Sequence, residues 1–328
     1  MKNTQTLYPL TFHPIPKEKI WGGTKLRKLL NKPFSGNHIG ESWEISDVGN
    51  DCSVVKNGPL AGNTLRDLMQ RYPKEIVGEE VYKKFKHHFP LLIKFIDARE
   101  NLSVQLHPDD EIAKKRHNSY GKTEMWYIMQ ADDDSRIIID FNEQISKDVY
   151  LKHLKKESLP TILNAEKVKT GDCYIIHPGL IHAIGKGVLL TEIQQTSDVT
   201  YRVYDWNRPD INGEKRELHT ALALDAIDFS KTSNYKLAYT KKENDSVRME
   251  QNQYFTTNYL YLTQAKAVSY ATVESFIIYI CVEGKCEISC KKTKEKVALN
   301  TGQTALIPAQ CEAVFIETDK CVLLEVTI

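Results

Sequence analysis

Three separate segments place polar side chains within otherwise apolar strands, and their residue types are the ones best suited to chemistry. The first segment, residues 102–109, reads LSVQLHPD, so that Ser103, Gln105 and His107 alternate with apolar residues. Alternate residues of a strand lie on one face, and these three polar groups therefore share a face. Buried polar groups are costly unless they are paired, so the face needs either solvent or a functional partner. Taken alone, a solvated strand face explains this segment equally well.

The second and third segments are also ambiguous when each is taken alone. Residues 121–127 read GKTEMWY, which puts Lys122 and Glu124 on one face of a strand, as a surface ion pair would. Residues 176–184 read IHPGLIHAI, and His182 follows a Pro-Gly turn inside an apolar strand. A lone histidine in such a strand is more often a satisfied core residue than a ligand.

Together the three segments indicate a metal centre. Gln105, His107, Glu124 and His182 offer two oxygen donors and two imidazole nitrogens. Zinc binds such donors, and iron or manganese would also accept them. A His-Pro pair (His107-Pro108), a glutamate and a Pro-Gly-x-x-His spread over three strands are typical of cupin metal sites. If the polar strand face lines a small barrel, these side chains converge inside it.

Hydrophobic patterning predicts the elements that position these residues. The predicted strands after Pro90 are 91–96, 102–106, 125–129, 136–139, 173–176, 181–184 and 188–193. Helices are predicted at 25–30, 79–85 and 216–227. Another should follow the cap Asn63-Thr64 and be interrupted at Pro73. A fifth should be capped by Ser146 and run to residue 156, with Val149, Leu151 and Leu154 facing inward. A polar connector at 240–253 precedes further strands.

A weak internal repeat predicts the architecture. Residues 169–178, KTGDCYIIHP, resemble residues 300–308, NTGQTALIP, and residues 126–129 resemble residues 278–281. Two antiparallel jelly-roll barrels would produce this repeat, although common strand and turn patterns would as well. We therefore expect a mainly β fold of two cupin-type jelly-roll barrels, with short helical excursions mostly in the N-terminal part. The expected domains are a catalytic cupin at 1–240 and a cupin-like domain at 241–328, which lacks a ligand set and should bind no metal.

The composition favours a folded protein and argues against a nucleic-acid or membrane partner. The chain has 328 residues, of which 41% are hydrophobic and 27% charged, as in a folded protein. Its 44 basic and 43 acidic residues argue against nucleic acid as a partner. Without an apolar run of about 18 residues or a signal-like start, we expect no membrane partner. Seven scattered cysteines favour reduced thiols and a cytoplasmic location, and we expect a monomer or a weak homodimer.

Six motifs in order resemble those of the type I mannose-6-phosphate isomerases in their short bacterial form. They are Trp21-Gly22-Gly23, Gly40-Glu41-Ser42-Trp43-Glu44, residues 102–108, Gly121-Lys122-Thr123-Glu124-Met125-Trp126, residues 178–183, and residues 195–202, QTSDVTYR. The resemblance spans nearly the whole catalytic half and continues more loosely to the end. It implies a zinc-dependent aldose–ketose isomerase that interconverts D-mannose 6-phosphate and D-fructose 6-phosphate through a cis-enediol intermediate.

The resemblance also implies the site residues. One Zn²⁺ per chain would be bound by Gln105, His107, Glu124 and His182. The essential active-site residue would be Arg202. Glu192 and Lys122 would be catalytic with it, and substrate would be bound by Trp21, Lys94, Ser103 and Asp198.

The reaction explains why such residues are needed. Negative charge that develops on the substrate oxygens requires a Lewis acid, which a bound zinc ion supplies. The substrate phosphate requires a cation, and Lys94, Lys122 and Arg202 are the candidates. Their individual roles remain open at this point, and a surface cation is the simple alternative for each.

The reaction also requires a proton carrier. Glu192 lies in an apolar strand, where burial would raise its pKa and make it a better base near neutral pH. We place it ahead of Asp198, with His38 and His13 as weaker options. Three alternatives to the proposed activity remain: an isomerase of another phosphorylated aldose, a non-zinc cupin oxygenase, and a noncatalytic sugar-phosphate-binding cupin.

Overall fold

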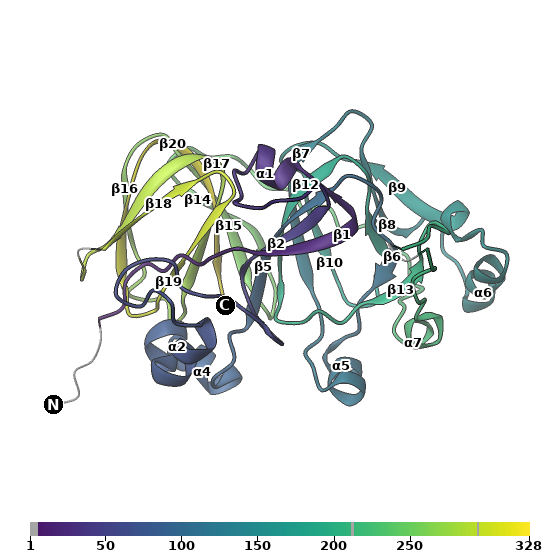
Figure 1. The fold of residues 1–328 in the computed structure, drawn as a ribbon, viewed down its shortest axis with the longest axis horizontal. Helices are drawn as coiled ribbons and strands as arrows, with labels where there is room; N and C mark the ends of the chain where they lie inside the picture. Colours follow the sequence, from purple (N-terminus) through teal and green to yellow (C-terminus); the bar gives the residue numbers. More distant parts are fainter. Residues whose placement is uncertain (1–5, 211–212, 294) are drawn as a thin grey trace.

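The computed structural model describes residues 6–210, 213–293 and 295–328, and it has two β-rich lobes side by side (Figure 1). All pairings between its strands are antiparallel. In this part of the chain, no helix has both the length and the apolar character needed to span a membrane.

One lobe is built from two sheets. The six-stranded sheet has the order β1 (Ile15–Gly23), β2 (Ile39–Ile45), β5 (Leu91–Ala98), β12 (Val188–Gln195), β7 (Glu124–Ala131) and β10 (Cys173–Ile176). The five-stranded sheet has the order β13 (Tyr201–Tyr204), β6 (Val104–Leu106), β11 (His182–Ile184), β8 (Arg136–Phe141) and β9 (Leu163–Lys167). Apolar residues from both sheets, including Ile96, Ile128, Ile137 and Ile139, share one buried cluster, so the sheets pack against each other.

The other lobe contains a seven-stranded sheet from the C-terminal part of the chain. Its main path is β14 (Ser246–Gln251), β15 (Thr256–Leu262), β20 (Ala313–Thr327), β17 (Ile277–Cys290) and β18 (Lys296–Asn300). Two further strands join it, β16 (Lys266–Ser269) on β20 and β19 (Gln303–Ile307) on β17, and a separate ribbon pairs β3 (Asp47–Val48) with β4 (Asp51–Cys52).

Short helices occupy the connections, most of them in the N-terminal part. They are α1 (Lys25–Lys28), α2 (Leu65–Arg71), α3 (Pro73–Val77), α4 (Glu79–Phe85), α5 (Asp110–His117), α6 (Lys147–Lys155), the 3₁₀ turn Leu159–Ile162 and α7 (Thr220–Leu224). Two predicted caps are confirmed: Thr64 forms a capping box with Asp67, and the Ser146 hydroxyl accepts from Val149 N. The interruption at Pro73 is confirmed, but Pro73 also begins a further short helix, α3, that was not predicted.

The mainly β class is confirmed, but the closed barrels are not. None of the sheets among the described residues closes on itself, so two jelly-roll barrels remain an expectation. The internal repeat does have a counterpart in the strand pairing. β10 pairs with β7 in one lobe, and β19 pairs with β17 in the other, which are the segments that resemble each other in sequence.

The two lobes share a hydrophobic core. Buried residues between Leu7 and Phe95 form a single cluster with residues between Met249 and Val326. Leu10 forms a β-bridge with Leu306, and α3 accepts a hydrogen bond at Ile76 O from Ala309 N. The N-terminal helices α2 and α4 therefore lie against the C-terminal lobe (Figure 1). The domain boundary at residue 240 stays a prediction.

Three local predictions were wrong. Val149 and Leu151 are each 38% exposed, and Tyr150 is the buried residue of α6 instead. The helix predicted at 216–227 shrinks to α7, because residues 213–219 follow an irregular path past β13 and donate His219 N to Arg202 O. The connector predicted at 240–253 contains β14, since even a polar strand can join a sheet edge through its backbone.

Candidate active site

The six-stranded sheet contributes one row of side chains to the site. β12 lies between β5 and β7, and Glu192 is directly opposite Lys94 on one side and Trp126 on the other. Lys94 is in turn opposite Trp43 of β2. Cross-strand neighbours project from the same face, so these four side chains form a continuous row. The alternation of the strands places their apolar neighbours, such as Phe95 and Ile193, on the other face, in the shared core.

The five-stranded sheet contributes a second row. β6 lies between β11 and β13, and Gln105 is opposite both His182 and Arg202. The predicted alternation is confirmed for β6 itself, because Gln105 faces the cavity while Val104 and Leu106 are buried in the core behind it. Leu102, which was expected on the face opposite Ser103, lines the cavity beside it instead, since the strand begins only at Val104. His107 follows β6 directly, and its carbonyl accepts from Gly179 N in the Pro-Gly turn before His182.

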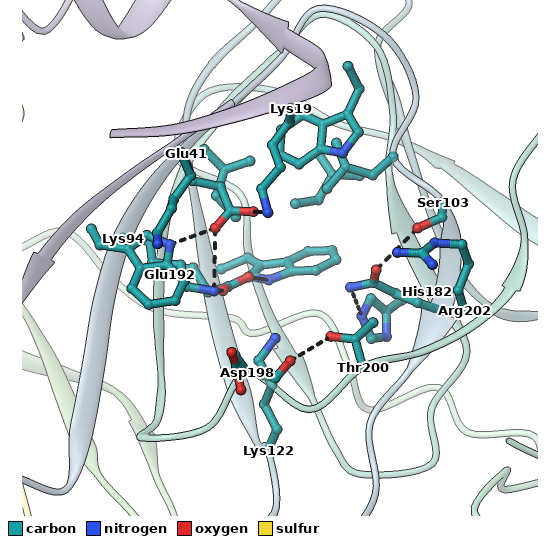
Figure 2. A pocket seen from close by; sticks show the side chains of 18 of the residues that line it. Lys19, Glu41, Lys94, Ser103, Lys122, His182, Glu192, Asp198, Thr200 and Arg202 are labelled. Atoms are coloured by element: carbon teal, nitrogen blue, oxygen red, sulfur yellow. Dashed lines mark hydrogen bonds and ion pairs between the residues drawn. The ribbon is translucent and has the colours of Figure 1, made fainter. Parts of the chain in front are cut away.

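A cavity of about 310 Å³ lies between the two rows (Figure 2). The structure places these predicted site residues on its wall: Trp21, Lys94, Ser103, Gln105, Lys122, His182, Glu192, Asp198 and Arg202. The other two, His107 and Glu124, are buried beside it and contact Lys122. The structure thus brings all the predicted site residues together, while their individual roles stay predictions.

Three of the four predicted metal ligands form a compact group. One donor atom each from His107, Glu124 and His182 lies within 4.8 Å of the others. His107 Nδ1 contacts Val199 O at 2.9 Å, and His182 Nδ1 contacts Leu180 O at 2.8 Å. A proton on each Nδ1 would leave both Nε2 lone pairs pointing at Glu124. This is the arrangement that outer hydrogen bonds give to metal-binding histidines.

The electrostatics of the group also fit a divalent cation. Burial and the neighbouring Lys122 lower the pKa of His107 to about 4, and burial lowers the pKa of His182, so both imidazoles are neutral. Burial would raise the pKa of Glu124, but Lys122 and His107 outweigh it and hold this pKa well below its usual value. Both Glu124 carboxylate oxygens are buried without a well-oriented hydrogen bond. Neutral imidazoles and an ionised carboxylate are the forms that bind metal.

Gln105 can complete the set with an oxygen. Its Nε2 lies 3.5 Å from His182 Nε2, while its Oε1 accepts from Ser103 Oγ at 3.4 Å. Rotation of the amide by a half turn exchanges the two atoms, and it would present Oε1 to the group. In this conformation Lys122 Nζ carries the positive charge of the cluster, in contact with Glu124 and 3.2 Å from His107 Nε2.

A second charged cluster lies across the cavity from the predicted ligands. Lys94 Nζ is 3.1 Å from Glu192 Oε1 and 3.8 Å from Glu41 Oε2, and Trp126 Nε1 donates to Glu192 Oε2 at 2.9 Å. Burial would lower the pKa of Lys94, but Glu192, Glu41 and Glu124 outweigh it and raise this pKa. The sequence argument expected Glu192 to be buried in an apolar strand, but it did not foresee the Lys94 ammonium group beside the carboxylate.

The sequence argument missed several residues of this cavity, among them Lys19, Glu41, Trp43 and Arg216. Trp43 Nε1 donates to Glu41 Oε2 at 2.6 Å, and Lys19 Nζ is 3.3 Å from Glu41 Oε1. Glu41 and Trp43 are two residues apart on β2, so the period-2 rule that found Gln105 could have paired them. Arg216 had no such signal, because it lies in an irregular segment far along the chain.

Comparison with known proteins identifies the family. Residues 10–127 match the family model "Phosphomannose isomerase type I, catalytic domain". The chain is 35% identical over 309 residues to the putative mannose-6-phosphate isomerase YvyI of Bacillus subtilis, covering 93% of this chain and 94% of that protein. It is 33% identical over 301 residues to the mannose-6-phosphate isomerase of Streptococcus mutans, covering 92% of each.

The chain belongs to the type I mannose-6-phosphate isomerase family. This isomerase also resembles a solved structure, the mannose 6-phosphate isomerase from Bacillus subtilis, with a TM-score of 0.87 and 32% sequence identity over 98% of this chain and all of the other. The class of enzyme expected from the six motifs, an aldose–ketose isomerase, is thereby confirmed.

Acid should weaken the folded isomerase through Glu41. Burial would raise the pKa of this carboxyl, but Lys94, Lys19 and the Trp43 indole hold it at about 2. Because an unfolded glutamate titrates near 4.3, the stabilisation is complete above that pH and is lost as the pH falls toward 2. We expect Glu41→Gln to lose about 3 kcal/mol of unfolding free energy at pH 7, and the deficit relative to wild type to shrink below pH 4.3.

Urea denaturation of chelator-treated protein at pH 7 and pH 3.5 would measure both effects. Glu18→Gln is the matched control, since Glu18 is an exposed residue of the neighbouring strand β1. A deficit of Glu41→Gln that stays constant with pH would contradict the assigned charge interaction.

Proposed function

We propose that this isomerase interconverts D-mannose 6-phosphate and D-fructose 6-phosphate in the cavity between the two sheets, and that it requires one Zn²⁺ per chain. The single observation that carries the proposal is the buried His107–Glu124–His182 group at a cavity lined by six cationic and four acidic residues. Such a cavity suits a small anion, and a buried N/O donor set suits a borderline divalent metal. A sugar phosphate needs both features.

The four proposed ligands are Gln105, His107, Glu124 and His182. When bound there, the zinc ion would supply a Lewis acid for negative charge on the substrate oxygens. The Lys122 ammonium contacts two of these ligands, so we assign it to the same substrate oxygens. This donor set with nearby lysines and arginines does not favour a cupin oxygenase, and membership of an enzyme family does not favour a noncatalytic sensor.

Glu192 is our first candidate for the proton carrier between C1 and C2. Its Oε1 is buried without a well-oriented hydrogen bond, although Lys94 lies 3.1 Å away, and its Oε2 is fixed by Trp126. Oε1 can therefore take the proton from one carbon and return it to the other through a cis-enediol. Asp198 is the second candidate, because it lines the same cavity but is exposed.

Proton transfer can be followed by deuterium incorporation from solvent into the product. We expect Glu192→Gln to lose this incorporation together with turnover, because the amide cannot accept the proton. Asp198→Asn should retain both at a reduced rate. The reverse result would make Asp198 the base.

Arg202 is our candidate for the phosphate. Four other cations of the cavity face a carboxylate: Lys17 faces Asp51, Lys19 and Lys94 face Glu41, and Arg216 faces Asp205. Arg202 instead donates NH1 to Glu217 O, and its Nε is buried without a partner among the described residues. Burial and the neighbouring Arg216 lower the pKa of Arg202. The two guanidinium groups therefore lie close together, and nearby carboxylates do not fully neutralise their charge. A planar guanidinium suits a phosphate.

The phosphate assignment predicts a change in substrate preference. Arg202→Ala should reduce kcat/KM for mannose 6-phosphate about 100-fold, the loss expected for a charged hydrogen bond of up to ~3 kcal/mol. The rate measured with unphosphorylated mannose should be the same as in wild type, and metal content should be unchanged. Equal losses on both substrates would place Arg202 at the reacting oxygens instead.

The metal assignment is tested by His182→Ala. Removing one imidazole from the buried set should release zinc, which elemental analysis would detect, and should abolish fructose 6-phosphate formation in a coupled assay. His177→Ala is the matched control, because His177 is exposed in the same segment. Full activity of His182→Ala without bound metal would overturn the proposal.

Other parts of the account rest on the sequence alone. The two cupin-type jelly rolls, the metal-free domain at 241–328, the cytoplasmic location and the monomer or weak homodimer remain predictions. Size-exclusion chromatography with light scattering would test the last of these.

A further inference from the structure

The two chain segments that carry His107 and Glu124 run next to each other outside the cavity. Lys122 N donates to Pro108 O at 3.2 Å, and Gly121 N donates to the Asp110 side chain at 2.8 Å. A Cβ at Gly121 would lie 2.6 Å from Asp110 N, so the glycine is needed for this close approach. The start of α5 and the start of β7 are therefore held in contact.

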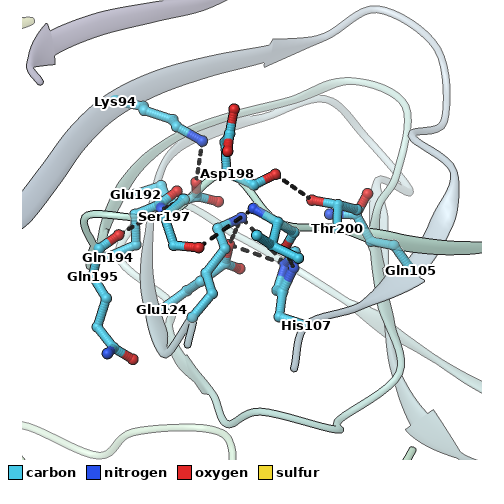
Figure 3. Close-up of polar contacts among 12 residues, drawn as sticks. Lys94, Gln105, His107, Glu124, Glu192, Gln194, Gln195, Ser197, Asp198 and Thr200 are labelled. Carbon is cyan, nitrogen blue, oxygen red and sulfur yellow. Dashed lines mark hydrogen bonds and ion pairs between the residues drawn. The ribbon is translucent and has the colours of Figure 1, made fainter. Parts of the chain in front are cut away.

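The side chain of Gln195, which belongs to a third segment, forms hydrogen bonds with both of these segments. Its Oε1 accepts from Thr123 N at 2.9 Å, and its Nε2 donates to Asp110 Oδ1 at 3.1 Å. Gln195 is buried and ends β12, three residues after Glu192. Figure 3 shows it directed away from the ligand group, so it does not contact the reacting atoms. Asp110 Oδ1 thus receives two hydrogen bonds, and Gln195 makes one to each segment.

The C-terminal lobe contributes one more residue to this hydrogen-bond network, Tyr254. Tyr254 lies between β14 and β15, and its hydroxyl donates to Asp110 Oδ2 at 2.7 Å. Both carboxylate oxygens of Asp110 are therefore occupied, although the residue is at the surface. This contact joins residues that are 144 positions apart in the chain.

We propose that Asp110 and Gln195 are positioning residues, which set the separation of His107 from Glu124, and that Tyr254 fixes Asp110 from the C-terminal lobe. None of the three is catalytic, because none contacts the cavity. The inference rests on the proposed metal site, since the benefit of a fixed ligand separation is the affinity for the ion. It also gives the C-terminal lobe, for which we expect no metal of its own, a role in the reaction.

The physical reason is that a metal site gains affinity when its ligands are held at the binding distance before the ion arrives. The imidazoles of His107 and His182 are already oriented by their Nδ1 contacts with Val199 O and Leu180 O. These bonds orient each ring, but they do not set the distance between β7 and the segment after β6. That distance depends on Gly121, Thr123 and Pro108, which are the groups joined by Asp110, Gln195 and one backbone bond.

Gln195→Met tests the inference, because it keeps the length and burial of the side chain but removes both of its hydrogen bonds. Loss of an outer partner typically costs 10–100-fold in metal affinity, and we expect about tenfold weaker zinc binding in competition with a chromogenic chelator. Asp110→Ala should weaken zinc binding to the same extent. The double variant should bind zinc about as well as the weaker of the two single variants, because both residues act through one hydrogen-bond network. Tyr254→Phe should weaken zinc binding less.

Two further measurements separate positioning from a general loss of stability. Asp110→Asn, which keeps an oxygen acceptor for Gly121 N and Gln195, should restore most of the affinity. Glu111→Gln is the control for charge in the first turn of α5, since Glu111 is exposed. The melting temperature of the metal-free protein should fall no further for Gln195→Met than for a variant whose zinc affinity is unchanged.

The outcomes distinguish this inference from the proposed function. If wild type binds no zinc in the competition assay, the metal site itself is wrong. If wild type binds zinc and is active, but Gln195→Met and Asp110→Ala bind it with wild-type affinity, the positioning role is wrong and the function stands. Weakened binding in Glu111→Gln equal to that in Asp110→Ala would also overturn the positioning role.

Discussion

Strand register decides whether this chain has an active site at all. Gln105 is opposite His182 and Arg202 in one sheet, and Glu192 is opposite Lys94 and Trp126 in the other. Because the side-chain period of a strand is two, a slip by one residue would turn either row into the hydrophobic core. The apolar residues between the polar ones oppose such a slip, since each is buried on the other face of its sheet. The same alternation thus folds the sheets and assembles the cavity.

Charge balance is the second constraint on this cavity. Several ammonium and carboxylate groups are buried there, and an unpaired buried charge is strongly destabilising. Lys94 contacts two glutamates, and Glu124 contacts a lysine and faces two neutral imidazoles. The groups that this pairing leaves incompletely satisfied are those where we place ligands: the Glu124 oxygens at the metal, Glu192 Oε1 at the carbon-bound proton, and Arg202 Nε at the phosphate.

Sequence reasoning was most successful where the two-residue alternation of a strand separates functional side chains from core side chains. The polar positions of residues 102–107 and the turn before His182 could be placed because each stands out against an apolar strand. Glu41 was harder, because its role depends on Lys19 and Lys94 from two other strands. The outward position of Val149 and Leu151 could not be predicted from helical spacing, because the face of α6 that is buried is set by what it packs against, and Tyr150 takes that place.

X-ray absorption at the zinc edge of the metal-loaded protein, with Glu124→Gln and Gln105→Ala as comparison variants, tests the central claim most directly. The account predicts one zinc ion per chain with two imidazole nitrogens and oxygen ligands in its first shell, and a loss of oxygen scattering in the Gln105→Ala spectrum. A first shell that contains sulfur, or one that is unchanged in both variants, would show that these four side chains do not share an ion.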